Sequence, residues 1–208
     1  RWRFGYQGTH SRPRSIPVPM SMRPLSRLPL SLAGLLLAPL AAHAQTTFFG
    51  PLPYTSTADR PAEFAPIGFE IHVEDAEDGA IDARLSVNAS VIGPGGLTDS
   101  VDADDGNIDG SGSNGRSLFA GAPVVVTFSS PLPVAAGLVW TDGGTPTSAT
   151  FEAFDAGGVS LGTLGPIAIG DLSNLGGTDE DRFFGIAHAA GISRIRISHT
   201  SGGYEVDH

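Results

Sequence analysis

Short runs of β-branched and aromatic residues, each closed by glycine, proline, aspartate or serine, limit most strongly what this chain can fold into. The chain has 208 residues, of which 28 are glycine and 16 are proline. That many glycines and prolines would break long helices, whereas short runs with turn residues between them predict an all-β domain. The predicted strands are Phe69–Val73, Ala83–Val91, Ser117–Phe119, Val124–Phe128, Ala136–Trp140, Ala149–Phe154, Val159–Leu164, Phe183–Ala187, Ile192–Ser198 and Tyr204–Val206.

Alternating polarity within these runs predicts how the strands pack. Ile195 and Ile197 interleave with Arg194 and Arg196, as expected for a strand with one buried and one solvated face. The segment Asp155–Gly158 has the composition of a hairpin turn, because glycine accepts positive φ without a steric penalty. Strands of this kind bury a core when two sheets pack face to face. We therefore predict an antiparallel β-sandwich of jelly-roll type.

The first 44 residues are not expected to belong to the folded domain. Arg23 and Arg27 precede an apolar run from Leu28 to Leu40, and small residues follow at Ala42 and Ala44. This order is typical of a secretory signal peptide. A membrane anchor is disfavoured because the run is shorter than about 20 residues. The predicted organisation is an upstream or disordered segment (1–21), the signal peptide (22–44), an extended N-terminal arm (45–66) and the sandwich (67–208), which we expect to continue past the last residue given.

Charge and cysteine content exclude several classes of partner and site. The net charge is −10, and the chain has no lysine and no cysteine. Nucleic acid is excluded as a partner because binding requires phosphates to be neutralised. Disulfide scaffolds and thiolate zinc sites are excluded as well. The signal peptide predicts a secreted or extracellular protein with no stable membrane span in the mature chain.

Acidic residues are crowded into one part of the sequence. Eleven of the 22 acidic residues lie between positions 70 and 109, and such crowding disfavours a compact state unless a cation is present. The segment Asp105–Gly110 matches the first half of a calcium loop, in which side-chain oxygens at positions 1, 3 and 5 converge on one ion. Arg116 stands where a helix-loop-helix calcium sensor needs a bidentate glutamate, so that class is excluded.

The interpretation that stays open is a loop of a β-sandwich that binds Ca²⁺ together with carboxylates from distant parts of the chain. Asp207 would supply a further oxygen ligand if the first and last strands are neighbours. A similar acidic turn, Glu77–Asp82, lacks the middle oxygen ligand. The alternative interpretation is a solvated acidic face that keeps the protein soluble. The predicted metal ligands are Asp102, Asp104, Asp105, Asn107, Asp109 and Asp207.

Several sequence motifs that resemble catalytic or binding sites have simpler structural interpretations. Gly158–Gly162 fits G-x-S-x-G, but a turn precedes Ser160 and a strand follows, so a nucleophile elbow is not expected. Gly110–Gly115 fits G-x-G-x-x-G without the surrounding βαβ unit. Trp140 and Tyr204 could form a sugar-stacking platform, although core packing is favoured for Trp140. The isolated histidines lack metal-ligand spacing and are His72, His188 and His199.

Five stretches rich in aspartate, glycine and aromatic residues carry a family resemblance. They are Leu97–Gly112, Gly137–Gly143, Thr150–Asp155, Glu180–Gly185 and Gly202–His208. Across about residues 66–208, the chain resembles secreted bacterial proteins that often end in a PEP-CTERM sorting signal. The resemblance implies an exopolysaccharide-associated β-sandwich without established catalytic residues. The Pro-Glu-Pro motif itself is not among the residues given.

These observations predict an exported, non-catalytic β-sandwich that binds an extracellular surface component, most plausibly polysaccharide, with Ca²⁺ stabilising its acidic loops. One alternative is a secreted glycoside hydrolase or lyase that uses Glu152 and Glu205. Such a pair needs its two carboxyl groups about 5 to 9 Å apart across a cleft. The other alternative is a structural matrix or surface-layer component that self-associates when calcium is added.

Overall fold

The structure of the chain is a computed structural model, in which the described residues lie within the unit Ala42–His208. The predicted upstream segment and all but the last residue of the predicted signal peptide lie outside the part of the chain that the structure describes. The described residues are 44–64, 70–95, 98–102, 106–108, 115–121, 123–142, 147–170, 173, 176–200 and 202–208.

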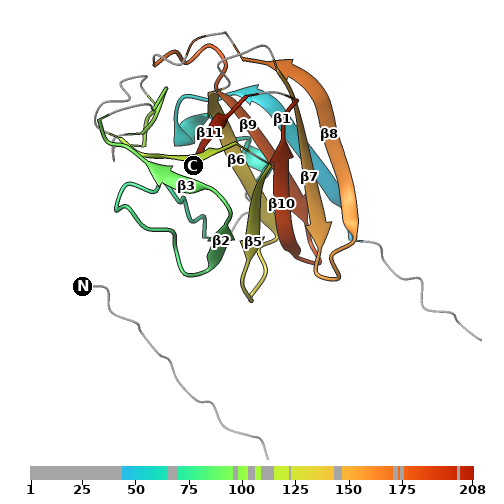
Figure 1. The fold of residues 1–208 in the computed structure, drawn as a ribbon. Coiled ribbons are helices and arrows are strands. Elements are labelled where there is room, and N and C mark those ends of the chain that lie inside the picture. The colour runs from blue at the N-terminus through green and yellow to red at the C-terminus, as the bar shows by residue number, and fades with distance from the viewer. Residues whose placement is uncertain are drawn as a thin grey trace, which may run out of the picture. The chain divides into compact units, whose positions relative to one another are not determined.

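Two antiparallel sheets face each other and account for nearly all of the regular structure (Figure 1). The six-stranded sheet has the order β1-β9-β6-β11-β4-β3, and the five-stranded sheet has the order β2-β5-β10-β7-β8. The strands are β1 (Thr46–Pro53), β2 (Leu85–Val87), β3 (Ser90–Ile92), β4 (Ser117–Ala120), β5 (Val124–Phe128), β6 (Ala135–Asp142), β7 (Thr147–Asp155), β8 (Ser160–Ile169), β9 (Arg182–His188), β10 (Ile192–Ser198) and β11 (Tyr204–Asp207).

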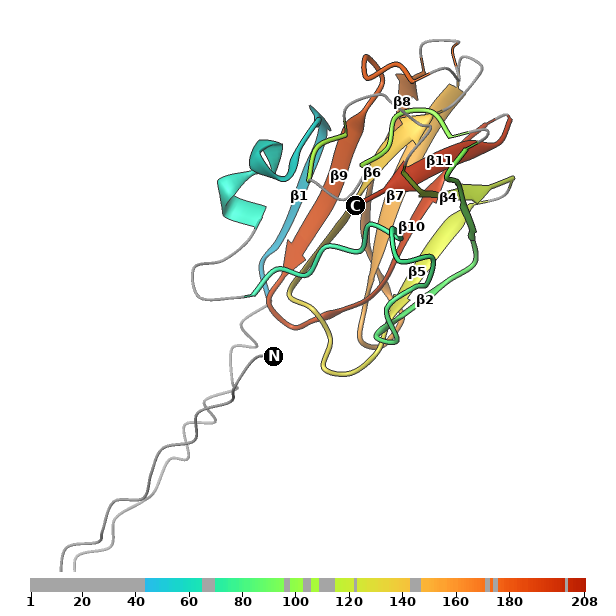
Figure 2. The same cartoon turned by 90° about the vertical axis from the view of Figure 1, so that its left-hand side faces the viewer.

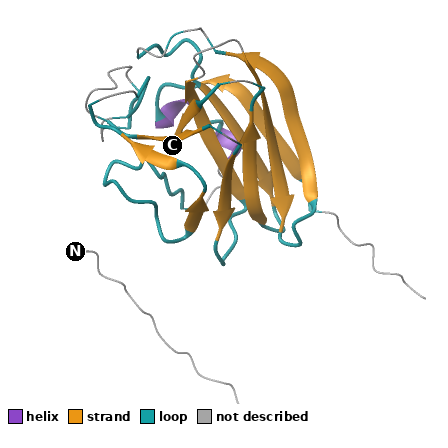
Figure 3. Cartoon of the chain, viewed as in Figure 1, coloured by secondary structure: helices purple, strands orange, loops and turns teal. Residues whose placement is uncertain are grey.

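The predicted all-β antiparallel sandwich is confirmed. From β4 to β7 and again from β8 to β11 the chain alternates between the sheets, β7 and β8 form a hairpin within one sheet, and the last strand lies between β4 and β6. That wrapping is compatible with the predicted jelly roll. The only helices among the described residues are two short 3₁₀ turns, η1 (Thr57–Asp59) and η2 (Ala62–Phe64) (Figure 3). Neither turn is long and apolar enough to cross a membrane.

The main core fills the space between the two sheets. The rings of Trp140 and Tyr204 stack with centroids 4.7 Å apart, and Phe151 stacks on Phe184. The Tyr204 hydroxyl donates to the Ile197 carbonyl of the opposite sheet at 2.8 Å. All five side chains belong to one buried apolar cluster. Burial of this surface is the main stabilising contribution to the sandwich.

Three predicted elements differ from the structure. Residues 46–53, expected within an extended arm, form β1 and pair with β9. The single strand predicted over Ala83–Val91 is wrong, because the chain changes sheets between β2 and β3. The strand predicted at Phe69–Val73 is also wrong, since residues 70–73 have no strand structure and residue 69 lies outside the described residues. In each case pairing with distant strands decides the structure, and a local pattern does not contain that information.

A third, partial layer covers part of the outer face of the six-stranded sheet. We call residues Tyr54–Phe64 the cap; it follows β1 and contains both 3₁₀ turns (Figure 2). The Phe64 ring contacts the Phe183 ring edge to face at 5.0 Å. Added Cβ atoms at Gly137 and Gly185 would lie within 3 Å of the Phe183 ring, so these glycines form the floor on which it lies. The second buried apolar cluster consists of Tyr54, Phe64, Ile108, Val139 and Phe183.

Candidate metal centre

Acidic side chains gather on the outer face of the six-stranded sheet, where β11 and β6 are neighbours. Tyr204 and Val206 of β11 belong to the core between the sheets. Because side chains alternate along a strand, Glu205 and Asp207 point to the outer face. Both are nevertheless buried. The last strand therefore places two carboxyl groups beneath the loops that cover this face.

A register shift turns Asp142 of β6 toward the same place. Trp140 packs in the core, so strict alternation would direct Asp142 inward as well. Val206 lies opposite Trp140, and one step along β11 Glu205 lies opposite Asp142. At this point β6 advances two residues while β11 advances one. Irregularities of this kind re-aim side chains, which brings Asp142 beside Glu205.

Three carboxylates from separate segments meet at this point. Asp99, Asp142 and Glu180 each offer an oxygen, and these oxygens all lie within 4.8 Å of one another. Asp99 comes from the loop that precedes β4, Asp142 ends β6, and Glu180 lies just before β9. Their exposed fractions are 0%, 8% and 3%, respectively. We call these three residues the acidic centre.

Hydrogen bonds hold Asp99 in position. Its backbone N–H donates to Glu205 Oε2 at 3.1 Å, and the same oxygen accepts from Ser117 Oγ at 3.0 Å. Its Oδ1 accepts from the backbone N–H groups of Gly176 and Gly177, the latter at 3.0 Å. Asp99 therefore connects two loops to β11 and β4, and one of its oxygens is already used in doing so.

The electrostatics of Glu205 show how unfavourable further negative charge is at this location. Burial is the largest cause that raises the pKa of Glu205 to about 7, and the charges of Asp142 and Asp99 raise it too. Hydrogen bonds from the Asp99 amide and from Ser117 act in the opposite direction. A carboxyl group in this environment takes up a proton, or needs a cation nearby, at neutral pH.

Thr141, the residue before Asp142, carries a buried neutral oxygen. It lies two residues after Val139, which packs on the outer face, so its side chain points to that face. Trp140 pairs with Arg182, which sets Thr141 beside Asp181, the residue before β9. Thr141 is fully buried, and its Oγ1 makes no hydrogen bond to the described residues. A buried hydroxyl without a partner costs about 1–3 kcal/mol, which a bound ligand would offset.

The chemistry of these groups suits a hard divalent cation. Ca²⁺ takes six to eight oxygen ligands from carboxylates, backbone and amide carbonyls, and water. The acidic centre offers carboxylate oxygens, and the chain has no cysteine that could favour a softer metal. Burying ionised carboxylates together costs on the order of several kcal/mol for each ion unless a positive charge compensates. The arrangement fits a cation better than it fits an apolar or anionic ligand.

The calcium ligands predicted from the sequence are only partly described. Asp102 and Asp207 come together, with the Asp102 N–H donating to Asp207 Oδ2 at 3.0 Å. Asn107 is exposed and forms a β-bridge with Ser56. The calcium loop itself stays a prediction. The predicted ligands that lie outside the described residues are Asp104, Asp105 and Asp109.

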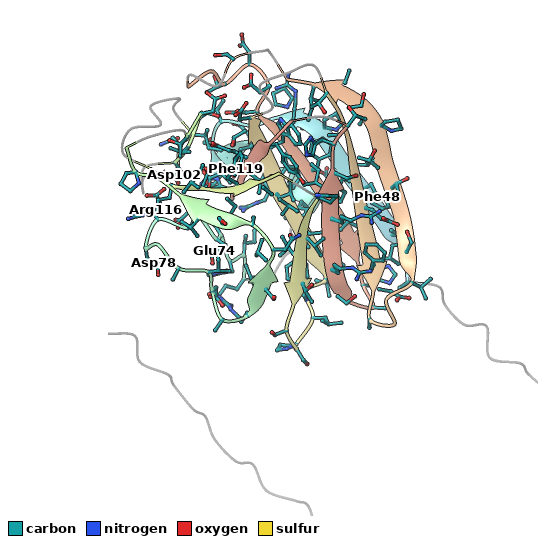
Figure 4. The ribbon with its side chains drawn as sticks, viewed as in Figure 1. Phe48, Glu74, Asp78, Asp102, Arg116 and Phe119 are labelled. Atoms are coloured by element: carbon teal, nitrogen blue, oxygen red, sulfur yellow. The ribbon has the colours of Figure 1, made fainter. Side chains whose placement is uncertain are left out.

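The acidic turn Glu77–Asp82 is held by protein groups. Asp82 accepts from Arg84 Nη2 at 2.7 Å and from Nε at 3.0 Å. These hydrogen bonds hold the pKa of Asp82 well below its usual range. Glu74 accepts from the Asp82 amide. Figure 4 shows Glu74 and Asp78 along this loop, with Arg116 beside it. The turn is stabilised by arginine and amide groups within the loop.

The proposed hydrolase pair does not form. Glu152 points outward from the five-stranded sheet and binds Arg196 Nη2 at 2.6 Å, while Glu205 points outward from the other sheet. Packed sheets lie about 10 Å apart, and both side chains point away from the space between them. Ser160 is an exposed residue at the start of β8 that donates to Glu152 Oε1, as the strand interpretation of G-x-S-x-G predicts. The other enzyme-like string, 110–115, lies outside the described residues except for Gly115.

The aromatic and histidine candidates occupy ordinary structural positions. Trp140 and Tyr204 are both fully buried, which confirms core packing and rules them out as a sugar-stacking surface. His72 Nε2 lies 3.3 Å from Asp82 Oδ2, His188 bonds to Thr46 Oγ1, and His199 packs against Tyr204. The three histidines therefore lie at three separate places.

Sequence reasoning missed the acidic centre because its members are far apart in the chain. One signal could have revealed it: Asp142 follows a predicted strand, and Glu180 and Asp181 precede another. When two such strands are antiparallel neighbours, these acids fall at the same end of the sheet. The neighbouring position of the two strands is the step that the sequence does not supply.

Comparison of the chain with protein-family models, with curated proteins and with solved structures finds no match.

Proposed function

We infer that the protein is an exported, non-catalytic β-sandwich that binds Ca²⁺ at the acidic centre and an extracellular polysaccharide at its surface. The observation that carries the calcium part is the convergence of three buried carboxylates within 4.8 Å. The buried Thr141 hydroxyl, on the residue before Asp142, makes no hydrogen bond to the described residues and is a second indication. A Kd of about 10⁻⁴ to 10⁻³ M is ordinary for extracellular calcium modules.

Isothermal titration of the protein with CaCl₂ tests the site. We expect one saturable calcium site, and we expect Asp142→Asn to remove it because the amide lacks the charge that a divalent cation requires. The matched control is Glu152→Gln, an acid on the other sheet paired with Arg196, which should bind calcium as the unmodified protein does. Absence of saturable binding, or binding that Asp142→Asn leaves intact, would refute the assignment.

Polysaccharide binding is supported by one exposed ring near the acidic centre. Phe119 of β4 is 40% exposed and lies opposite Glu205 of β11 (Figure 4). An added Cβ at Gly203 would lie 2.5 Å from the Phe119 ring, so the ring lies against the backbone just before β11. Aromatic rings present a flat apolar surface against which the C–H groups of a sugar can stack.

Affinity electrophoresis in gels containing bacterial exopolysaccharide tests this part. We expect retardation in calcium that Phe119→Ala weakens. Val159→Ala removes a more exposed apolar side chain, 65% exposed, at the hairpin of the other sheet and serves as the control. Equal mobility of the protein and of Phe119→Ala in every gel would remove the polysaccharide proposal and leave the calcium site standing.

A further inference from the structure

We propose that calcium at the acidic centre controls the docking of the cap through a strap formed by residues 98–102 and 106–108. This inference rests on the proposed function and extends it, since it assigns a regulatory consequence to the same site. The first part of the strap contains a proposed calcium ligand, Asp99, and its other part hydrogen-bonds to the cap.

The first part of the strap is fixed to β11 by two backbone contacts. The Asp99 N–H donates to Glu205 Oε2 at 3.1 Å, and the Asp102 N–H donates to Asp207 Oδ2 at 3.0 Å. Between them, Ser100 Oγ donates to Asp181 Oδ1 at 2.7 Å. This part of the strap therefore lies along the acidic outer face of the sheet.

The second part of the strap pairs with the cap. The Ile108 N–H donates to the Thr55 carbonyl at 2.8 Å, and the Thr57 N–H donates to the Gly106 carbonyl at 3.3 Å. Ile108 is also buried in the apolar cluster that contains Phe64 of the cap. Displacing this part of the strap would break both hydrogen bonds and open that cluster.

Asp102 joins the two parts. Its carboxylate accepts from the Gly106 N–H at 2.9 Å, and its Oδ2 lies 2.9 Å from His208 Nε2. The other ring nitrogen of His208 lies 3.0 Å from the hydroxyl of Tyr54, the first residue of the cap. Asp102 and Ile108 also form a β-bridge. A movement at Asp99, three residues away, therefore reaches the cap through short connections.

Without a cation, repulsion among buried carboxylates acts at the Asp99 end of the strap. At the far end the strap holds the cap through two backbone hydrogen bonds and the cluster around Ile108, and local opening is governed by the least stable set of contacts. We expect calcium to hold Asp99 in place and thereby keep the cap docked, whereas removing calcium releases the cap before the sandwich unfolds.

Hydrogen exchange of the whole protein, measured in calcium and in chelator, tests the coupling. We expect the amides of Thr57 and Ile108 to exchange at least about tenfold faster in chelator. Amides of β10 in the opposite sheet should change much less. Asp142→Asn, which alters a residue outside both strap and cap, removes one charge and a calcium ligand, so its cap exchange should be the same in calcium and in chelator. Glu152→Gln should behave like the unmodified protein.

Calcium binding measured on the same samples separates the two proposals. Binding without a change in cap exchange, or with equal changes in the cap and in β10, would overturn the coupling and leave the calcium site standing. Absence of calcium binding would overturn both. A protected cap in calcium and an exposed cap in chelator, with β10 nearly constant, is the result that the strap predicts.

Discussion

Glu205 is the residue at which the charge balance of the acidic face can be read most directly. Its side chain is almost fully buried, it receives hydrogen bonds from the Asp99 amide and Ser117, and it faces Asp142 across the ladder. Burial is the main cause that raises its pKa to about 7. Burial also raises the pKa of Asp207, two residues later, well above its ordinary value. Protons and cations therefore compete to neutralise this face.

A pH dependence of stability follows from the raised pKa of Glu205. A carboxyl group with pKa about 7 in the folded state and about 4.3 when unfolded binds more protons in the folded protein between these values. Its stabilising effect is complete below the unfolded pKa and is lost as pH rises through about 7. The expected loss is about 4 kcal/mol, at 1.36 kcal/mol for each unit of pKa difference.

Urea unfolding in chelator at pH 5, 6, 7 and 8 measures this dependence. Glu205→Gln should flatten the profile because it removes the titrating group, while Glu152→Gln should keep it. A profile for Glu205→Gln as steep as that of the unmodified protein would show that another group is responsible.

At the scale of elements, local chemistry predicts strands and turns well where it is sufficient by itself. The hairpin between β7 and β8 is such a case: Asp155 Oδ1 accepts from the N–H groups of Gly157 and Val159, and Gly158 has φ +76°. Alternation along β10 and β7 also predicts their buried faces correctly. These features depend on residues close together in the chain, so they can be read from the sequence.

Elements defined by distant partners could not be predicted in the same way. β1 contains Pro51 and Pro53, which lower strand propensity, and it is a strand because β9 offers a free edge for pairing. The chain leaves one sheet after β2 and enters the other at β3, although the segment reads as one strand. The choice of sheet is set by pairing with β5 and β4, which lie elsewhere in the sequence.

At the scale of the whole molecule, the chemistry of the candidate site could be predicted from the sequence, whereas its location depends on contacts between distant segments. A contiguous acidic loop suggested calcium from the sequence, and the structure adds a group of three buried carboxylates at positions 99, 142 and 180. The chemistry expected, a hard cation among carboxylates, could be anticipated from composition. The location of these carboxylates could not be predicted, because it depends on the pairing of β6 with β9 and β11 and on one register shift.

Thermal unfolding of the protein and of Asp142→Asn, each in calcium and in chelator, tests the central claim most directly. A cation that binds only the folded state at a hundred times its Kd stabilises by about 2.7 kcal/mol. At about 2–4 °C for each kcal/mol, calcium should raise the Tm of the unmodified protein by about 5–10 °C.

The order of stability of Asp142→Asn and the unmodified protein should reverse between chelator and calcium. In chelator, Asp142→Asn should be the more stable protein because it removes one of three crowded negative charges. In calcium it should be the less stable one, since it cannot gain from the ion. Equal calcium responses of the two proteins, or a variant that is less stable in chelator as well, would contradict a calcium site at Asp99, Asp142 and Glu180.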